Sequence, residues 1–326
     1  MTTPLLDVRD LTVTINRDGR PITALDKVSF SVNPGEVLGV VGESGAGKSI
    51  TGAAIIDLLV PPLKRTGGTI SLNGDRLDQL SPKEMRRVRG GKIGFIFQDP
   101  MTSLNPVITI GRQLCDTIET HLRLGGNETK RRALDWIARV GLPNPNVQFK
   151  RYPHQLSGGM RQRIVIALAL CANPSLVIAD EPTTALDVSV QAHILQLMRD
   201  LHRESEVSMM LITHDLGVIS KMADRVAVLY AGRVAEISPV AELFANPSHP
   251  YTRGLIRATP MPTADGGVQL DQIPGAMPGL GAVPPGCAFN PRCFRAQSDC
   301  RSVVPPLVTQ ESSAFSCFHP LERDVA

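Results

Sequence analysis

The sequence lacks a hydrophobic run long enough to span a membrane. The longest uninterrupted run, residues 164–172, lies between Arg163 and Asn173, whereas a membrane-spanning helix needs about 20 apolar residues. The N-terminal segment MTTPLLDVRD also lacks the basic and apolar regions of a secretory signal. We therefore expect a chain that does not cross a bilayer and that works in the cytosol.

The sequence also has little excess of charge of either sign. It holds 34 Lys and Arg against 31 Asp and Glu, a net charge of +3. The short basic clusters at 86–89 and 130–132 are typical of solvated helix faces when the total is near neutral, so we expect no nucleic-acid partner. Hydrophobic residues make up 42% and charged residues 20%, which predicts a sizeable buried core.

Cysteine is scarce over most of the chain. The first 286 residues hold two, Cys115 and Cys171, in apolar helical contexts typical of core residues. The other four are clustered at the C-terminal end: Cys287, Cys293, Cys300 and Cys317.

The clustered cysteines indicate metal ligands rather than disulfides, because a cytosolic chain keeps its thiols reduced. Their spacing, C-x5-C-x6-C-x16-C, matches neither the C-x2-C pairs of common zinc modules nor the cysteine run of bacterial ferredoxins. Spacing alone therefore leaves the metal open, and His319 could replace one of the ligands.

The hydrophobic pattern predicts an α/β fold. Residues 5–42 alternate as partly buried strands do, which predicts an antiparallel β subdomain at the N-terminus. Short apolar runs at 37–42, 92–97, 176–180 and 209–213 suit strands buried on both faces of a parallel sheet. The stretch from about 99 to 170 reads as mostly helical and predicts an inserted helical subdomain.

The pattern of strands and helices ends near residue 245, after a predicted hairpin that turns at Ala231-Gly232. Residues 259–291 are rich in proline and glycine, a composition that cannot build a conventional core. We therefore predict one domain over 1–245 and a small C-terminal extension over 246–326, which carries the four clustered cysteines.

A glycine-rich segment follows the strand predicted at 37–42 and precedes a helical stretch. It fits the pattern G-x-x-x-x-G-K-[ST], whose backbone N–H groups curl around phosphate oxygens. The lysine would neutralise the β- and γ-phosphates, and the serine would place its hydroxyl on Mg²⁺. The residues predicted to hold nucleotide here are Gly42, Glu43, Ser44, Gly45, Ala46, Gly47, Lys48, Ser49 and Ile50.

The strand predicted at 176–180 ends in two carboxylates. Asp180 can hold a magnesium-bound water, and Glu181 can polarise an attacking water. Active sites of open α/β sheets form at the carboxyl ends of strands, which is where the glycine-rich segment also lies. We therefore predict a magnesium and catalytic site at this strand end.

A second glycine pair opens the helix that contains the apolar run. Ser157 is its predicted N-cap, and Gly158 and Gly159 leave the first N–H groups open to a ligand. The segment is thus a second candidate anion site, with a merely well-capped helix as the alternative.

Together these motifs resemble one family closely, the ATP-binding-cassette ATPases, over about residues 5–245. The family's signature LSGGQ appears at 156–160 with methionine in the last position. In that family the nucleotide lies between two head-to-tail subunits, which explains why one chain holds two phosphate-binding helices. The resemblance implies a P-loop NTPase core that binds ATP and Mg²⁺.

The resemblance also implies roles for single residues. Gln98 in FQDP resembles the glutamine that senses magnesium and the transmembrane partner, and His214 in LITHD resembles the switch histidine. Asp187 belongs to a segment, Ala185-Leu186-Asp187, that looks like the dimer-contacting D-loop. The implied catalytic residues are Glu181, His214 and Gln98, and the implied magnesium ligands are Ser49, Gln98 and Asp180.

The C-terminal part resembles the extension of oligopeptide and dipeptide importer ATPases. The resemblance rests on NPSHPYT at 246–252, FQDPMTSLNP at 97–106 and YPHQLSGGM at 152–160. In this subgroup the four cysteines are associated with a [4Fe–4S] cluster, so the resemblance implies such a cluster here, with a structural role. The implied function is ATP hydrolysis that powers import of di- or oligopeptides.

The same resemblance implies partners and a location. These are two transmembrane permease subunits, a second ATPase subunit that is a paralogue rather than a second copy, and, indirectly, an extracytoplasmic solute-binding protein. The chain would lie peripherally at the cytoplasmic face of the inner membrane. The alternatives are an importer ATPase for nickel, opines or glutathione, a nucleotide-dependent scaffold, and a non-transport cassette ATPase acting on DNA or ribosomes.

One departure from the family concerns the nucleotide base. The family usually stacks adenine on an aromatic residue of the N-terminal β region, but no aromatic residue precedes Phe30 here, so Ile15 or Ile22 would substitute. Aliphatic packing keeps hydrophobic contact but loses the ring-on-ring geometry. We therefore predict relaxed discrimination between ATP and GTP, with similar kcat/KM values for the two. A strong preference for ATP would contradict this prediction.

Overall fold

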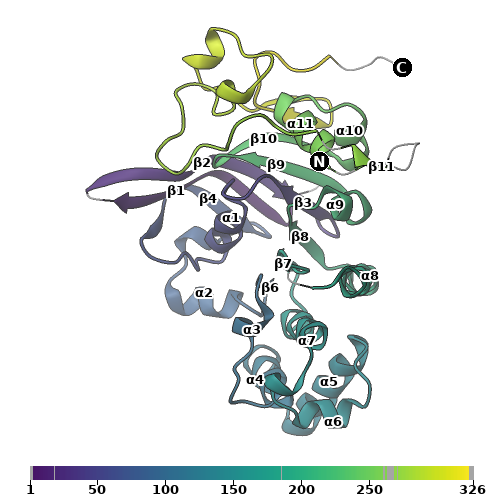
Figure 1. Ribbon diagram of the computed structural model, residues 1–326. Coiled ribbons are helices and arrows are strands. Elements are labelled where there is room, and N and C mark those ends of the chain that lie inside the picture. Colours follow the sequence, from purple (N-terminus) through teal and green to yellow (C-terminus); the bar gives the residue numbers. More distant parts are fainter. Residues whose placement is uncertain are drawn as a thin grey trace. The chain divides into compact units, whose positions relative to one another are not determined.

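The computed structural model describes residues 3–17, 19–184, 186–259, 261–262, 268–269 and 271–322 (Figure 1). The chain forms two compact units: unit 1 comprises residues 1–78 and 211–326, and unit 2 comprises residues 79–210. Both ends of the sequence therefore belong to unit 1. Among the described residues, no helix has both the length and the apolar composition to cross a membrane.

Unit 1 begins with an antiparallel sheet whose strand order is β2-β1-β4-β5. Its strands are β1 (Leu6–Arg17), β2 (Arg20–Val32), β4 (Leu63–Leu72) and β5 (Asp75–Arg76). Leu6, Val8, Leu11 and Val13 of β1 are buried, which confirms the predicted N-terminal β subdomain. The sequence pattern did not predict β4, because its sequence LKRTGGTISL has few apolar residues and two adjacent glycines, which are depleted in strands.

A second group of strands in unit 1 has the order β13-β14-β10-β9-β3. Its bounds are Val37–Val41 for β3, Arg225–Tyr230 for β9, Arg233–Pro239 for β10, Val308–Gln310 for β13 and Ser313–Phe315 for β14. β3 and β9 are parallel, whereas β9 and β10 form the predicted hairpin. The C-terminal strand β14 pairs with β10, so the cysteine-containing part of the chain extends this sheet.

The helices of unit 1 are α1 (Lys48–Ile55), α9 (Leu216–Met222), α10 (Val240–Ala245) and α11 (Pro250–Ala258). Two further strands, β11 (Met261–Pro262) and β12 (Val268–Gln269), form a separate pair.

Glu236 of β10 is fully buried and accepts hydrogen bonds from the N–H groups of Ser248 and His249, both at 2.9 Å. Burial raises the pKa of this carboxyl, and the two N–H donors are the partners that a buried carboxylate requires. The start of α11 is thereby fixed to the sheet.

Three buried rings complete this part of the core. The Tyr230 ring centroid lies 4.5 Å from that of Tyr251 and 5.2 Å from that of Phe289, and the centroids of Tyr251 and Phe289 are 5.3 Å apart. Edge-on and tilted aromatic contacts of this kind stabilise beyond area burial alone. The proline- and glycine-rich tail therefore packs through residues contributed by the sheet.

Unit 2 contains the parallel pair β6 (Ile93–Ile96) and β7 (Leu176–Asp180), in the register Ile93↔Leu176. β8 (Ser208–Ile212) follows β7 in the strand order and contains the boundary between the units. All residues of β7 and β8 are buried, as their uninterrupted apolar runs predict.

The rest of unit 2 is helical, in agreement with the predicted insertion. Its helices are α2 (Pro82–Val88), α3 (Pro100–Ser103), α4 (Ile110–Leu122), α5 (Gly126–Arg139), α6 (Pro145–Lys150), α7 (Gly158–Leu170) and α8 (Val188–Ser205). The apolar sides of α4 and α5 bury Leu114, Ile118, Trp136 and Ile137, at the helical spacing expected of a core-facing stripe.

Candidate functional site

The glycine-rich loop joins β3 to α1 in unit 1. Gly42 has a φ of +150° and Gly47 a φ of +102°, values that favour glycine. A Cβ on Gly42 would lie 2.2 Å from the carbonyl oxygen of Leu229, and a Cβ on Gly47 would lie 2.6 Å from Cδ2 of Leu25. The loop is therefore packed closely against β9 and β2, and these two positions accept no larger residue without a shift.

Lys48, the first residue of α1, is buried under this loop. Its Nζ donates to the carbonyl oxygens of Gly42 at 2.8 Å and Glu43 at 3.1 Å, which satisfies an ammonium group that would otherwise be costly to bury. Ser44, Gly45 and Ser49 are exposed. The loop thus presents backbone and hydroxyl groups to solvent at a helix N-terminus, where the helix dipole favours anions.

A cavity of about 730 Å³ in unit 1 is lined by the β1–β2 hairpin, the β9–β10 turn and residues 281–284. Ile22, one of the two isoleucines predicted to substitute for the aromatic platform, belongs to this lining. So does Thr23, which directly precedes the Ala24-Leu25 pair that contacts Gly47 of the loop. The lining also includes the charged residues Arg17, Arg20, Asp26 and Arg233, so an open and largely polar space lies close to the contacts of the glycine-rich loop with β2.

The acidic end of β7 is organised within unit 2. Asp180 is buried, and Glu181 has a φ of +46°, a conformation that is uncommon for a residue other than glycine and occurs at functional sites. The Glu181 carboxylate oxygen Oε2 accepts hydrogen bonds from Gln98 Nε2 at 3.1 Å and from Thr184 Oγ1 at 2.8 Å. The structure therefore brings Gln98 and Glu181 together, although 83 positions separate them.

Thr184 is a residue that sequence reasoning missed. It holds the carboxylate of Glu181 by a hydroxyl donated from the turn after β7, where the Thr184 N–H also donates to the Glu181 carbonyl oxygen at 3.2 Å. A side chain that hydrogen-bonds a neighbour three residues away is typical of turns. In the sequence, the hydroxyl of the last threonine in DEPTT is the feature that could have indicated this role of Thr184.

The signature segment opens α7 as predicted. The Ser157 hydroxyl accepts a hydrogen bond from the Met160 N–H at 3.4 Å, Gly158 is exposed and Gly159 is partly buried. The Gln162 side chain donates to the Pro182 carbonyl oxygen at 2.6 Å, so α7 is tied to the turn that follows β7. The exposed helix start and the Gln98–Glu181 pair thus belong to one connected framework.

The remaining predicted residues lie at exposed positions. Asp187 is exposed at the N-cap of α8, and Ala185 of the same predicted segment lies outside the described residues. His214 is exposed between β8 and α9. Lys48, Ser49 and His214 belong to unit 1, whereas Gln98, Asp180, Glu181, the signature segment and Asp187 belong to unit 2.

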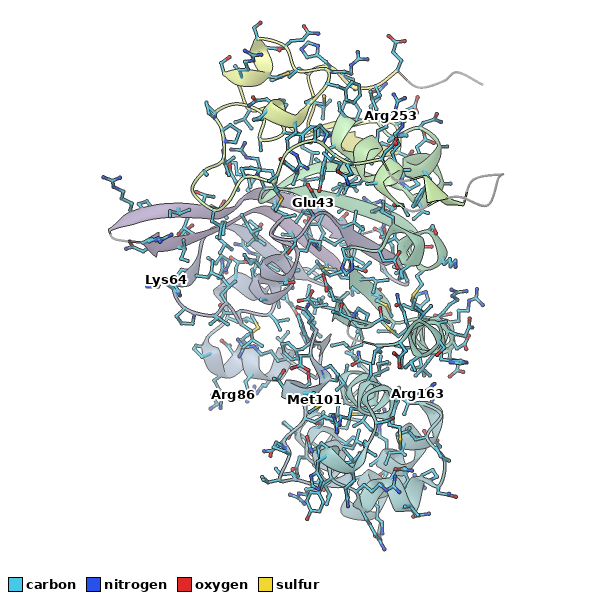
Figure 2. All side chains as sticks on the ribbon, viewed as in Figure 1. Glu43, Lys64, Arg86, Met101, Arg163 and Arg253 are labelled. Carbon is cyan, nitrogen blue, oxygen red and sulfur yellow. The ribbon has the colours of Figure 1, made fainter. Side chains whose placement is uncertain are left out.

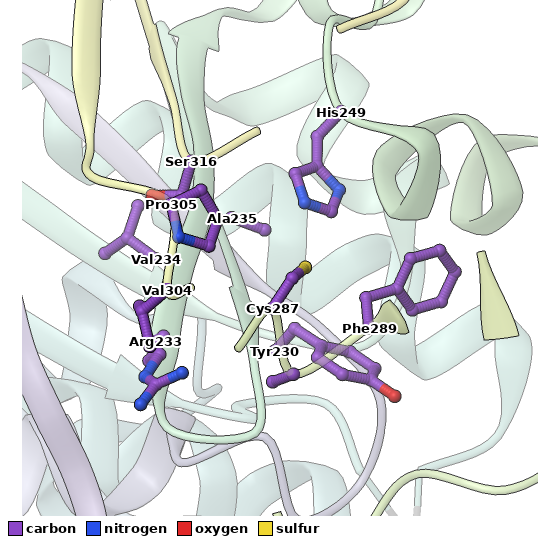
Figure 3. A pocket seen from close by; sticks show the side chains of 11 residues that line it. Tyr230, Arg233, Val234, Ala235, His249, Cys287, Phe289, Val304, Pro305 and Ser316 are labelled. Carbon is purple, nitrogen blue, oxygen red and sulfur yellow. The ribbon is translucent and has the colours of Figure 1, made fainter. Parts of the chain in front are cut away.

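The four cysteines of the C-terminal part line one small cavity in unit 1. The Cys287 N–H donates to the Cys300 carbonyl oxygen at 2.8 Å, which draws two cysteine-bearing turns together. Figure 3 shows the neighbouring hollow, in which the Cys287 side chain lies between Tyr230 and His249. Burial raises the pKa of the Cys287 and Cys293 thiols and raises that of Cys317 to about 11.

Cysteine side chains are donors for a metal ion or cluster, and four of them belong to the lining of this cavity. Asp299, Cys300 and His319 also form a group whose ligand atoms lie within 4.8 Å of one another, and His319 Nε2 is 2.9 Å from Asp299 Oδ2. Thiolate sulfur suits zinc and iron–sulfur clusters, and a mixed sulfur, nitrogen and oxygen set suits zinc. The geometry therefore supports metal binding without distinguishing these two cases.

Comparisons with known proteins agree with the fold and with the family that the sequence resembles. The family profile for ABC transporters matches residues 25–184, and the profile for the oligopeptide/dipeptide transporter C-terminal region matches residues 235–300. A putative peptide import ATP-binding protein of Brucella melitensis is 46% identical over 321 residues, 94% of each chain. The dipeptide transport ATP-binding protein DppD of Bacillus subtilis is 45% identical over 316 residues, covering 96% of this chain and 94% of DppD.

Solved structures show the same similarity. A dimeric ATP-binding cassette in a post-hydrolysis state with ADP and Pi has a TM-score of 0.65 at 30% identity, covering 72% of this chain and 98% of that chain. The protein cbiO1 of Clostridium perfringens, part of the cbiONQ ABC transporter complex, has a TM-score of 0.64 at 26% identity, covering 74% of this chain and 91% of that chain.

The glycine-rich loop between β3 and α1, within an α/β fold shared with solved cassettes, defines a P-loop ATPase. The two profile matches, and the relatives that align with nearly the whole chain, identify the family more narrowly. The chain belongs to the ATP-binding-cassette family, in the oligopeptide/dipeptide transporter group.

Proposed function

We propose that this chain is the ATP-hydrolysing subunit that powers import of di- or oligopeptides through a membrane transporter. One observation carries the proposal: a nucleotide-binding cassette and the oligopeptide/dipeptide transporter C-terminal region occur in one chain. That chain matches proteins named for peptide import over nearly its whole length. The C-terminal region is what separates this proposal from a cassette ATPase acting on DNA or ribosomes.

Transport by this chain requires membrane partners, because its own described helices do not span a bilayer. The proposed partners are two permease subunits and a second ATPase subunit, a paralogue, with an extracytoplasmic binding protein acting through the permeases. The chain would then lie at the cytoplasmic face of the inner membrane. Import of nickel, opines or glutathione would use the same arrangement with a different cargo.

Purification of the chain from its own membranes in mild detergent tests the transport assignment. Mass spectrometry is expected to find two polytopic proteins and a second, non-identical ATPase. Two permeases without a second ATPase would replace the paralogue by a second copy of this chain. A ribosome-bound or wholly soluble complex would contradict the importer function while leaving the ATPase activity intact.

The site residues divide into binding and hydrolysis roles. Lys48 and the loop N–H groups would hold the β- and γ-phosphates, while Ser157, Gly158, Gly159 and Asp187 would face the nucleotide of a partner subunit. Ser49, Gln98 and Asp180 offer the hydroxyl, amide and carboxylate oxygens that Mg²⁺ prefers, and a bound Mg²⁺ would neutralise charge on the phosphates. His214 would stabilise the arrangement in which water attacks the γ-phosphate.

Glu181 is the proposed group that polarises water. Its carboxylate oxygen Oε2 is held by two donors, Gln98 and Thr184, so the carboxylate keeps a defined direction. A positioned carboxylate of this kind typically contributes a rate factor of about a hundred or more. Gln98 therefore acts on water through Glu181 as well as on magnesium.

Two substitutions separate these roles. Lys48→Ala is expected to abolish measurable ATP binding, because it removes the cation of the loop, whereas Glu181→Gln should bind ATP but hydrolyse it about a hundredfold or more slowly. Equilibrium binding and phosphate release measure the two effects. Glu204→Gln, at an exposed position of the same unit, is the matched control. Wild-type turnover in Glu181→Gln would remove that residue from the reaction.

We further propose that Cys287, Cys293, Cys300 and Cys317 hold a [4Fe–4S] cluster. Four thiols lining one cavity support it, and thiolates are the usual ligands of such clusters. The cluster would stabilise a tail that is short of apolar core, as metals do in small domains. The Asp299, Cys300 and His319 group supports a zinc ion as the alternative occupant.

Anaerobic purification followed by iron, sulfide and zinc analysis distinguishes the two occupants. The expected result is absorbance near 400 nm with iron and acid-labile sulfide in equal amounts, lost in Cys293→Ser and kept in Cys115→Ser, which changes a core cysteine of unit 2. Stoichiometric zinc without iron would exclude the cluster.

A further inference from the structure

The C-terminal part of the chain binds the glycine-rich loop through hydrogen bonds to Glu43. The guanidinium of Arg292 binds its carboxylate at two points, with Nη1 2.7 Å from Oε2 and Nη2 3.0 Å from Oε1. The hydroxyl of Tyr251 accepts a hydrogen bond from the Glu43 backbone N–H at 2.9 Å. Glu43, labelled in Figure 2, therefore has both its side chain and its backbone fixed by residues more than 200 positions later in the chain.

Arg292 is itself held in place. Its side chain is 5% exposed, its Nε donates to the Pro274 carbonyl oxygen at 2.8 Å, and its guanidinium carbon lies 5.9 Å from the ring centroids of Tyr230 and Phe289. A two-point guanidinium–carboxylate pair is both strong and directional. A buried guanidinium without such a carboxylate would be strongly destabilising, so the burial of Arg292 depends on its pairing with Glu43.

The negative charge of Glu43 would oppose nucleotide binding if it were unpaired, and Arg292 neutralises it. Glu43 is the second residue of the loop, and its side chain is partly exposed. An unpaired carboxylate near the phosphates of ATP would repel them, and such repulsion grows where the surroundings exclude water. Paired with Arg292, the carboxylate is neutralised and turned toward the C-terminal part of the chain.

A further contact lies two residues along the loop. A Cβ placed on Gly45 would be 3.0 Å from Cε of Met277, so residue 277 covers the outer side of the loop. The loop is thus bounded by β9 and β2 on one side and by the C-terminal part on the other. Its backbone geometry depends on both.

We propose that Arg292 is a positioning residue of the nucleotide site, which neutralises Glu43 and, with Tyr251, fixes the loop for phosphate binding. This inference rests on the role proposed above for the loop. Arg292 directly precedes Cys293, which lines the cysteine cavity together with Asn290.

The test compares ATP affinities of the full-length chain by calorimetry in EDTA, which prevents hydrolysis. Arg292→Ala is expected to weaken ATP binding about tenfold, within the usual range for coupled sites, and to weaken ADP binding less, because ADP carries less charge. Adding Glu43→Gln to Arg292→Ala should restore most of the loss, since no unpaired carboxylate remains. Arg257→Ala, an exposed arginine of α11, should match the wild type.

Two further variants keep the test decisive if Arg292→Ala fails to fold. Arg292→Lys keeps the charge but not the two-point geometry, and Tyr251→Phe removes one hydroxyl, so each should weaken ATP binding by a smaller factor than Arg292→Ala. Thermal unfolding reports folding for every variant.

Three outcomes would overturn the inference. They are wild-type ATP affinity in Arg292→Ala or Arg292→Lys, no recovery in the Glu43→Gln double variant, and equal losses for ATP and ADP. Failure of the underlying site assignment looks different, because Lys48→Ala would then still bind ATP. If Lys48→Ala loses ATP binding while the Arg292 variants do not, the loop binds nucleotide but Arg292 has no part in it.

Discussion

The nucleotide site of unit 1 depends on the close packing of the glycine-rich loop against β2 and β9. Gly42 and Gly47 let it lie directly on the Leu229 carbonyl and the Leu25 side chain. Lys48 satisfies two carbonyl oxygens that would otherwise turn outward. A flexible loop would lose conformational entropy when it closes on a phosphate, so packing it in advance favours binding.

The C-terminal part contributes to this packing in a way that its composition conceals. Residues rich in proline and glycine bury little apolar surface by themselves, and here they attach to an existing sheet through β14, the buried Glu236 and the rings of Tyr251 and Phe289. Their attachment brings Arg292 to Glu43. The segment that carries the cysteines therefore contacts the phosphate loop directly through the Arg292–Glu43 pair. A structural change in one can be transmitted to the other through this pair.

Unit 2 holds the Glu181 carboxylate in a fixed orientation. Gln98 and Thr184, both uncharged donors, hydrogen-bond to the same oxygen of this carboxylate. The bond from Gln162 to the Pro182 carbonyl oxygen links the signature helix to the same turn. The signature helix and the carboxylate are thus connected through one short segment.

The sequence by itself determined the features that depend on local spacing: the strands of continuous apolar residues, the helical insertion, the β9–β10 hairpin, the phosphate loop and the signature helix. Hydrophobic periodicity and glycine positions are local, so they can be recognised without the fold. β4 was not recognised because its sequence has few apolar residues and two adjacent glycines. Tertiary structure alone decided that Gln98 meets Glu181, that Ile22 lines a cavity, and that Arg292 pairs with Glu43 across 249 positions, because such contacts depend on how distant segments pack.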